Sequence, residues 1–146
     1  MKRISKHISY KEATVSNYAK QNGIINKPTK EQLETMEVMA EGVFEPLREW
    51  VDAPIRVNSM FRSLELNTAL KGSITSSHMK GQAIDITSMG GKSNLEMFHY
   101  IKDNLDFDQL IWEFGEEPRW LHVSYKKEGN RKQVLVTKKQ GVYYTF

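Results

Sequence analysis

The chain has 146 residues, the size of one ordinary domain, and this length suffices to bury a sizeable apolar core. Apolar residues make up 39% of the chain and charged residues 27%, a balance that excludes disordered, collagen-like and low-complexity proteins. The formal net charge of +3 permits an acidic partner without requiring one. Because the sequence contains no cysteine, it excludes disulfides, cysteine-based zinc sites, iron–sulfur clusters and thiol catalysis, so any metal needs His, Asp or Glu ligands.

The opening segment MKRISKHISYK is basic, but no apolar stretch of signal-peptide length follows it. Nor does the chain contain a run of about eighteen apolar residues, the length that spans a bilayer. We therefore expect synthesis in the cytoplasm without a signal peptide. Because there is no internal repeat and no Gly/Ser-rich or Pro-rich linker, residues 1–146 are expected to form a single domain.

Three capping motifs predict the starts of helices. Each pairs a Ser or Thr with a Glu or Gln three residues later: Ser9 with Glu12, Thr29 with Gln32, and Ser93 with Glu96. The helices expected from these motifs cover residues 10–20, 30–47 and 94–104. The second of them is long and amphipathic, and we expect Pro46 to disturb it.

Between and after these helices, the apolar period changes from that of a helix to that of a strand. Five segments rich in β-branched and aromatic residues are expected as strands: 55–58, 83–87, 109–114, 120–125 and 133–137. The last three are close enough in sequence to form an antiparallel meander. The pattern predicts an α+β fold, with helices packed on one antiparallel sheet.

The first candidate for chemistry is His78, one of four histidines. It precedes Asp85 by seven residues, with Gly81 between them. If this segment were extended, the two side chains would be more than about 20 Å apart. They can share a metal only if the chain turns back, and Gly81 supplies the backbone freedom for such a turn. Chance pairs of this spacing are common, so the spacing alone favours a structural role.

The second candidate is His122, which alternation places on one strand face with Trp120 and Ser124, opposite the apolar Leu121 and Val123. The strand before it carries Glu113, and the connection between the two strands is short enough for a hairpin. Glu113 is then expected diagonal to His122 on the same face.

Two imidazoles and one carboxylate suit a zinc ion with an open coordination position. Such an ion lowers the pKa of bound water towards about 7, and a separate carboxylate such as Glu113 can move the proton. Together these groups are suited to hydrolysing a peptide bond.

At these residues the chain resembles the zinc D-Ala-D-Ala carboxypeptidases, the M15 peptidases, and among them the short phage and prophage members. The pattern S-x-H-x-x-G-x-A-x-D is met by Ser76, His78, Gly81, Ala83 and Asp85, and the later W-x-H-x-S by Trp120, His122 and Ser124. The resemblance implies the hedgehog/DD-peptidase fold. It also implies that the zinc ligands are His78, Asp85 and His122.

The resemblance further implies roles around the metal. Arg62 matches an arginine that faces the substrate, and Ser76 and Trp120 are expected to help bind it. Many relatives carry the catalytic acid three residues before the second metal-binding histidine, but this chain has an arginine there. We therefore assign that role to Glu113. The alternatives are Glu116 and Glu117.

The function implied is that of a monomeric zinc metallopeptidase that cuts peptidoglycan stem peptides. It would act as a phage lysis enzyme (endolysin) or as a virion component, as a D,D-carboxypeptidase or endopeptidase or an L-alanyl-D-glutamate peptidase. The alternative is a zinc-stabilised binding module of the same fold that cuts nothing. The basic segment 125–139 is a weaker indication of nucleic-acid binding, because no known binding motif accompanies it. We expect no nucleic-acid partner and no membrane insertion.

Overall fold

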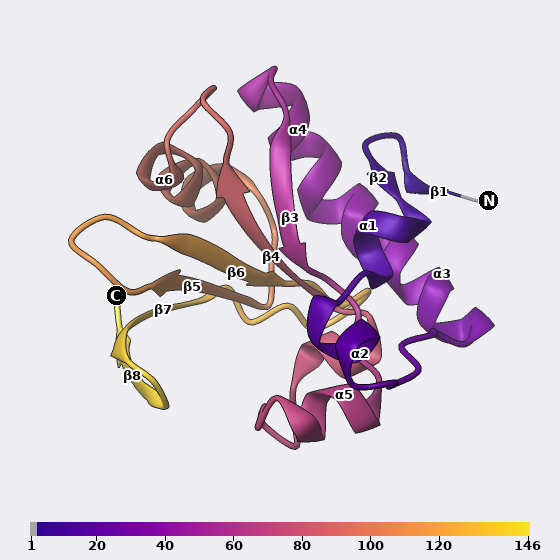
Figure 1. Cartoon of the computed structure of the whole chain (residues 1–146). Coiled ribbons are helices and arrows are strands. Elements are labelled where there is room, and N and C mark those ends of the chain that lie inside the picture. The colour runs from indigo at the N-terminus through magenta and orange to yellow at the C-terminus, as the bar shows by residue number, and fades with distance from the viewer. Residues whose placement is uncertain (1–2) are drawn as a thin grey trace.

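Figure 1 shows the computed structural model of the chain, which describes residues 3–146. Met1 and Lys2, the first residues of the basic opening segment, lie outside the described residues. The α-helices of the described part are α1 (Tyr10–Thr14), α2 (Asn17–Gln21), α3 (Lys30–Met39), α4 (Glu45–Val51), α5 (Leu64–Ala69) and α6 (Asn94–Asn104). None of them has the length and apolar character needed to cross a membrane.

A mixed sheet forms the centre of the molecule. Its strands, in spatial order, are β3 (Ile55–Ser59), β4 (Ala83–Ser88), β6 (Trp120–Ser124), β5 (Gln109–Glu113), β7 (Gln133–Lys139) and β8 (Val142–Thr145). A separate small ladder joins β1 (Arg3–Ser5) to β2 (Ile8–Ser9). Helices packed on this sheet make the fold α+β, as the sequence predicts.

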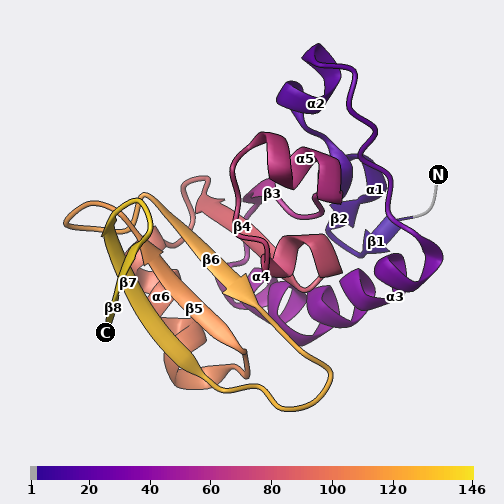
Figure 2. The same ribbon diagram turned by 90° about the horizontal axis from the view of Figure 1, so that it is seen from below.

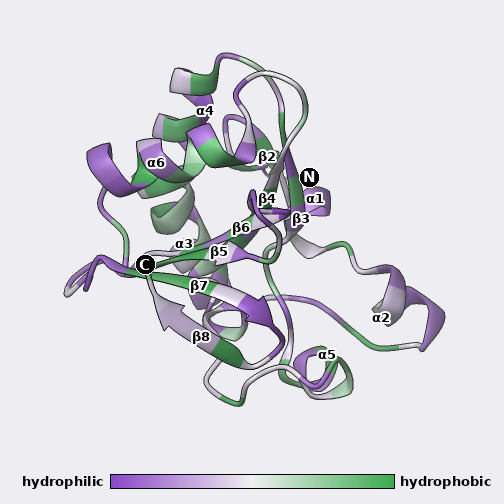
Figure 3. Ribbon diagram, turned by 90° about the vertical axis from the view of Figure 1, so that its left-hand side faces the viewer, coloured by the Kyte–Doolittle hydropathy of each residue, from purple (hydrophilic) through white to green (hydrophobic). Residues whose placement is uncertain are grey.

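One face of the sheet is covered by helices, and the other is open. Viewed from below in Figure 2, the strands β4, β6, β5 and β7 lie in front of α4 and α6. The buried cluster joins α3, α4 and α6 to the apolar side chains on one face of the central strands, among them Ile84, Leu110, Leu121 and Val123. In Figure 3, hydrophobic residues occupy much of β5 and the first part of β7, and α6 alternates between hydrophobic and hydrophilic residues.

The long helix expected over residues 30–47 forms with a change of hydrogen bonding in its middle. A π-helical turn (Ala40–Phe44) links α3 to α4, and the Glu45 N–H donates to the Ala40 carbonyl five residues back. Pro46 follows in the first turn of α4, and because it has no N–H it cannot donate a hydrogen bond to the preceding helical turn. The predicted disturbance at Pro46 is confirmed.

The helix expected over residues 10–20 is wrong in one respect, because it divides into α1 and α2. Val15 is extended, with φ −68° and ψ 138°. Ser16 then caps a new helix, and its Oγ accepts a hydrogen bond from the Ala19 N–H at 3.1 Å. The Ser16 Oγ thus takes the place of the backbone carbonyl that would accept the Ala19 N–H in a continuous helix.

The expected antiparallel meander is also wrong, and the sheet is mixed rather than antiparallel. Strands β5 and β6 do form an antiparallel hairpin, but β7 pairs with β5 in parallel. Residues 125–132 cross the start of β5, where the buried carboxylate of Asp108 binds them. Arg131 donates to both oxygens of this carboxylate, from Nε at 2.9 Å and from Nη2 at 2.8 Å. The strand order was predicted from the alternation of apolar residues, and this alternation carries no information about the contact between Asp108 and Arg131.

We predict that Arg131→Ala destabilises the fold by about 1–2 kcal/mol, because it leaves the buried Asp108 carboxylate without its strongest partner. Urea unfolding measures the change. The control is Lys138→Ala, which removes an exposed cation from β7 and is expected to have little effect. Equal stability of the two variants would contradict the anchoring role of Arg131.

Candidate active site

His78 lies on a 3₁₀ helix (Ser77–Lys80) that turns the chain into β4. Ser76 caps this helix, and its Oγ accepts a hydrogen bond from the His78 N–H at 3.3 Å. Gly81 ends it with φ +75°, and a Cβ at this position would lie 2.8 Å from the Gln32 carbonyl oxygen. Glycine is therefore required both by the backbone conformation and by the close approach to α3.

Asp85 and His122 face each other across neighbouring strands. Asp85 on β4 is the direct partner of His122 on β6 in the antiparallel ladder. Directly opposed residues in a ladder point to the same face. Both side chains therefore project from the open face of the sheet, while Ile84 and Val123 point into the core.

The turn and the ladder together bring three possible metal ligands to one point. His78 Nε2 lies 3.3 Å from Asp85 Oδ2, and His122 Nδ1 lies 3.0 Å from Asp85 Oδ1. One ligand atom from each residue lies within 4.8 Å of the others. The imidazole rings of the two histidines meet edge-on, with their centroids 5.1 Å apart.

The environment of His78 fits a metal. Its Nδ1 lies 2.7 Å from the Met60 carbonyl oxygen, an acceptor that requires this nitrogen to carry the proton. The lone pair is then on Nε2, which is buried and makes no hydrogen bond within the described residues. A carbonyl that orients the far nitrogen of a histidine is the usual support of a metal ligand. The His78, Asp85 and His122 donors therefore fit a divalent ion such as zinc.

Asp85 is held as an anion. Burial alone would raise its pKa, but the close contacts with His78 and His122 outweigh burial and lower the pKa well below its usual range. Its side chain is 19% exposed, so little solvent screens these contacts. The carboxylate is thus ready to bind a cation.

Glu113 lies beside His78, Asp85 and His122, and its pKa is raised where that of Asp85 is lowered. It pairs with Trp120 while its neighbour Ile111 pairs with His122, so Glu113 is diagonal to His122 on the open face, as the sequence predicts. Burial raises the pKa of Glu113 from 4.5 to about 7, and the negative charge of Asp85 adds to this effect while His122 opposes it. A carboxyl group with such a pKa can accept and return a proton near neutral pH.

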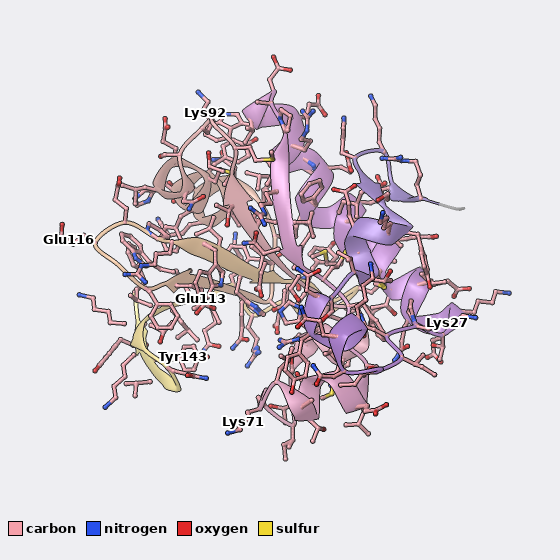
Figure 4. The ribbon with its side chains drawn as sticks, in the orientation of Figure 1. Lys27, Lys71, Lys92, Glu113, Glu116 and Tyr143 are labelled. Carbon is pink, nitrogen blue, oxygen red and sulfur yellow. The ribbon has the colours of Figure 1, made fainter. Side chains whose placement is uncertain are left out.

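These side chains line a single cleft of about 670 Å³ on the open face of the sheet. Among its residues are all those to which the sequence assigns a role: Arg62, Ser76, His78, Asp85, Glu113, Trp120 and His122. Figure 4 labels Glu113 on β5, with Tyr143 of β8 below it.

Arg62 and Trp120 flank the possible ligands on different sides. Arg62 Nη2 donates to Ser76 Oγ at 3.4 Å, whereas its Nε is buried without a hydrogen-bond partner in the described structure. The pKa of Arg62 is lowered by burial, which Asp85 opposes, so this guanidinium is partly desolvated. The Trp120 ring packs on Phe114 at 5.3 Å between centroids. The Arg62 side chain can bind an anion at one end of the cleft, and the Trp120 ring can contact an apolar group.

Comparison with known protein families identifies the family to which the chain belongs. The family profile of Peptidase M15 matches residues 6–124, a span that includes every predicted ligand and catalytic residue. The chain belongs to the Peptidase M15 family. A search of curated proteins finds no match to it. Membership in the M15 family supports peptidase activity, and the cluster of His78, Asp85 and His122 is suited to the metal on which M15 peptidases typically depend.

Both alternatives to Glu113 as the catalytic acid lie outside the cleft. Glu116 is exposed and borders a separate cavity with Trp112 and Phe146. In Figure 4 it lies at the far tip of the loop between β5 and β6, away from Glu113. Glu117 is exposed as well and does not line the cleft. The geometry therefore favours Glu113 among the three glutamates.

The remaining histidines have other contacts. His7 Nδ1 lies 2.6 Å from Glu45 Oε1 and so ties the amino-terminal ladder to α4. His99 packs edge-on against Phe98 and Phe146. Neither residue lines the cleft of the M15 site.

Sequence analysis missed the carboxyl-terminal wall of the cleft. Leu135, Gln140, Gly141 and Tyr143 line it, and all lie after residue 124, where the family match ends. Finding them requires the parallel pairing of β7 with β5, which strand periodicity does not predict. Gln109 and Ile111, which alternate along β5 with residues of the opposite face, line the cleft together with Glu113.

We predict that Glu113→Gln stabilises the metal-free protein above pH 7 by about 1–2 kcal/mol, a figure reduced for partial exposure. Because the pKa of Glu113 is raised in the folded state, its ionisation favours unfolding, and the wild-type protein loses stability as the pH rises from about 4.5 through 7. Glutamine cannot ionise, so the two proteins should coincide near pH 4 and diverge at pH 8.

Urea unfolding in the presence of a chelator, at both pH values, measures this difference. Glu116→Gln serves as the control, because the Glu116 side chain is exposed and this substitution should leave the stability unchanged at either pH. A Glu113→Gln variant that gains nothing at pH 8 would show that the carboxylate is not desolvated.

Proposed function

We propose that the protein is a zinc-dependent peptidase that hydrolyses peptide bonds in peptidoglycan stem peptides. The single observation that carries this proposal is the convergence of His78, Asp85 and His122 beside a desolvated Glu113 in one cleft. Membership in the M15 family supports the peptidase part. The lytic role on the cell wall rests on the resemblance of both histidine motifs to those of cell-wall peptidases.

His78 Nε2, the Asp85 carboxylate and His122 Nδ1 would hold the zinc ion. Two neutral nitrogens and one anion leave a net positive charge, and three protein ligands are typical of catalytic rather than structural zinc. When bound, zinc polarises a carbonyl and makes water more acidic. The Met60 carbonyl keeps His78 in the tautomer that binding needs.

Glu113 would move the proton of the reaction. Its carboxylate accepts a proton from the attacking water as the water oxygen bonds to the carbonyl carbon. The same proton then passes to the nitrogen of the leaving amine as the C–N bond breaks. The position of Glu113, diagonal to His122 and open to the cleft, suits a group that must reach both water and amine.

Arg62, Ser76 and Trp120 would bind the substrate. A guanidinium with a buried and unpartnered Nε suits a carboxylate of the stem peptide, to which it can donate two hydrogen bonds. Ser76 orients Arg62, and the Trp120 ring offers an apolar surface next to Glu113. The bond cut, either D-Ala-D-Ala or another D,D bond or L-Ala-D-Glu, is to be identified from the mass of the products.

The proposed site of action is the cell wall, which the protein would meet during phage lysis or as a virion component. Every residue to which we assign a role lies in this one cleft, and we propose that the protein acts as a monomer. The competing proposal is a binding module of the same fold that cuts nothing. It is favoured by Arg119, an exposed residue that occupies the position where many relatives carry the acid.

We predict that the zinc-loaded protein releases new amino groups from purified peptidoglycan, and that Glu113→Gln lowers this rate by about a hundredfold or more while keeping stoichiometric zinc. His78→Ala should lose both zinc and activity, because it removes a ligand. Glu116→Gln, on the loop outside the cleft, should behave as the wild type.

Zinc content by mass spectrometry and amine release measure the two properties separately. Stoichiometric zinc without amine release in the wild-type protein would favour the binding module. Protein that takes up no zinc would overturn the proposal at its base.

A further inference from the structure

A row of opposed residues crosses the sheet from the carboxyl-terminal hairpin to the candidate active site. Tyr143 on β8 opposes Thr137 on β7, Thr137 opposes Glu113 on β5, and Glu113 opposes Trp120 on β6. Because opposed residues share a face, all of these side chains belong to the open face. Tyr143 accordingly lines the cleft with Glu113 and Trp120.

The hairpin that carries Tyr143 is built into the sheet. The Thr137 hydroxyl, which is buried, lies 2.8 Å from the Lys139 carbonyl oxygen and 2.7 Å from that of Val142, and so closes the turn from inside. Gly141 supplies the positive φ of +80° that this turn requires. At the other end of β7, Gln109 Nε2 donates to Gln133 Oε1 at 2.7 Å. The position of Tyr143 relative to Glu113 is therefore fixed by ladder contacts.

Tyr143 and its neighbour Tyr144 point to opposite faces. Tyr144 borders the separate cavity beside Trp112 and Phe146, whereas Tyr143 lines the cleft. Figure 4 shows Tyr143 directed to the region below Glu113. No hydrogen bond within residues 3–146 engages the Tyr143 hydroxyl, so this donor is free for a ligand.

The hydroxyl of Tyr143 is protonated at neutral pH, as tyrosine hydroxyls ordinarily are, and its pKa is shifted further upward. Burial raises the pKa of Tyr143, and the negative charges of Glu113 and Asp85 raise it further. A phenol that stays protonated at neutral pH donates a hydrogen bond. The spacing of strands places the Cα of Tyr143 about 10 Å from that of Glu113, within reach of a peptide that lies across both.

We propose that Tyr143 is a substrate-binding residue whose hydroxyl donates a hydrogen bond to a backbone carbonyl of the bound stem peptide, on the side of Glu113 opposite Trp120. This inference rests on the proposed function for the identity of the ligand. The β7–β8 hairpin lies beyond residue 124, where the family match ends, so it forms a wall of the cleft outside the matched segment. The peptide would then lie along the open face, between Trp120 and Tyr143.

The test compares Tyr143→Phe with Tyr144→Phe, which removes a hydroxyl from the adjacent residue on the other face. Steady-state hydrolysis of a peptidoglycan-derived stem peptide gives kcat and KM for the zinc-loaded proteins. Tyr143→Phe should raise KM about tenfold with kcat unchanged, since a hydrogen bond kept from ground state to transition state affects binding alone. Tyr144→Phe should leave both constants unchanged, and both variants should keep the wild-type Tm.

Calorimetric binding of the same peptide, in proteins that also carry Glu113→Gln, separates this inference from the proposed function. If the wild type does not cleave but the peptide binds and Tyr143→Phe weakens binding about tenfold, the inference holds and the peptidase proposal fails. If the wild type cleaves and Tyr143→Phe matches Tyr144→Phe, the inference is overturned and the peptidase proposal stands. If the peptide is neither bound nor cleaved, both are overturned.

Discussion

The site depends on the contact of one carboxylate with two imidazoles. Asp85 lies 3.3 Å from His78 and 3.0 Å from His122, and these contacts keep it ionised although burial favours its neutral form. Without a cation, this arrangement leaves His78 Nε2 buried and without a hydrogen bond. A buried polar atom without a partner is costly, and a divalent ion bound at this point would satisfy it. The raised pKa of Glu113 follows in part from the same negative charge.

The strand pleat allows the core and the site to occupy one sheet. Along β4 and β6, alternate residues face the helices, and the residues between them face the cleft. The core face buries Ile84 and Val123 completely, and this packing holds the register that opposes Asp85 to His122. A slip of either strand by one residue would turn the ligand on that strand into the core. The stability of the helical layer is thus what fixes the distance between the ligands.

The sequence predicted those features that depend on local pattern. Caps located α3 and α6, alternation placed His122 and Glu113 on one face, and Gly81 indicated the turn that returns His78 to Asp85. The parallel pairing of β7 could not be predicted in this way, because it depends on contacts between segments far apart in sequence. Since Tyr143 reaches the cleft only through that pairing, the wall it forms was found in the structure alone.

The most direct test of the central claim is the position of the metal. Crystals of the zinc-loaded protein should give one anomalous-difference peak at the zinc edge, about 2.0–2.2 Å from His78 Nε2, His122 Nδ1 and an Asp85 carboxylate oxygen. A peak that touches only one of these residues, or a site that stays empty at stoichiometric zinc, would contradict the account.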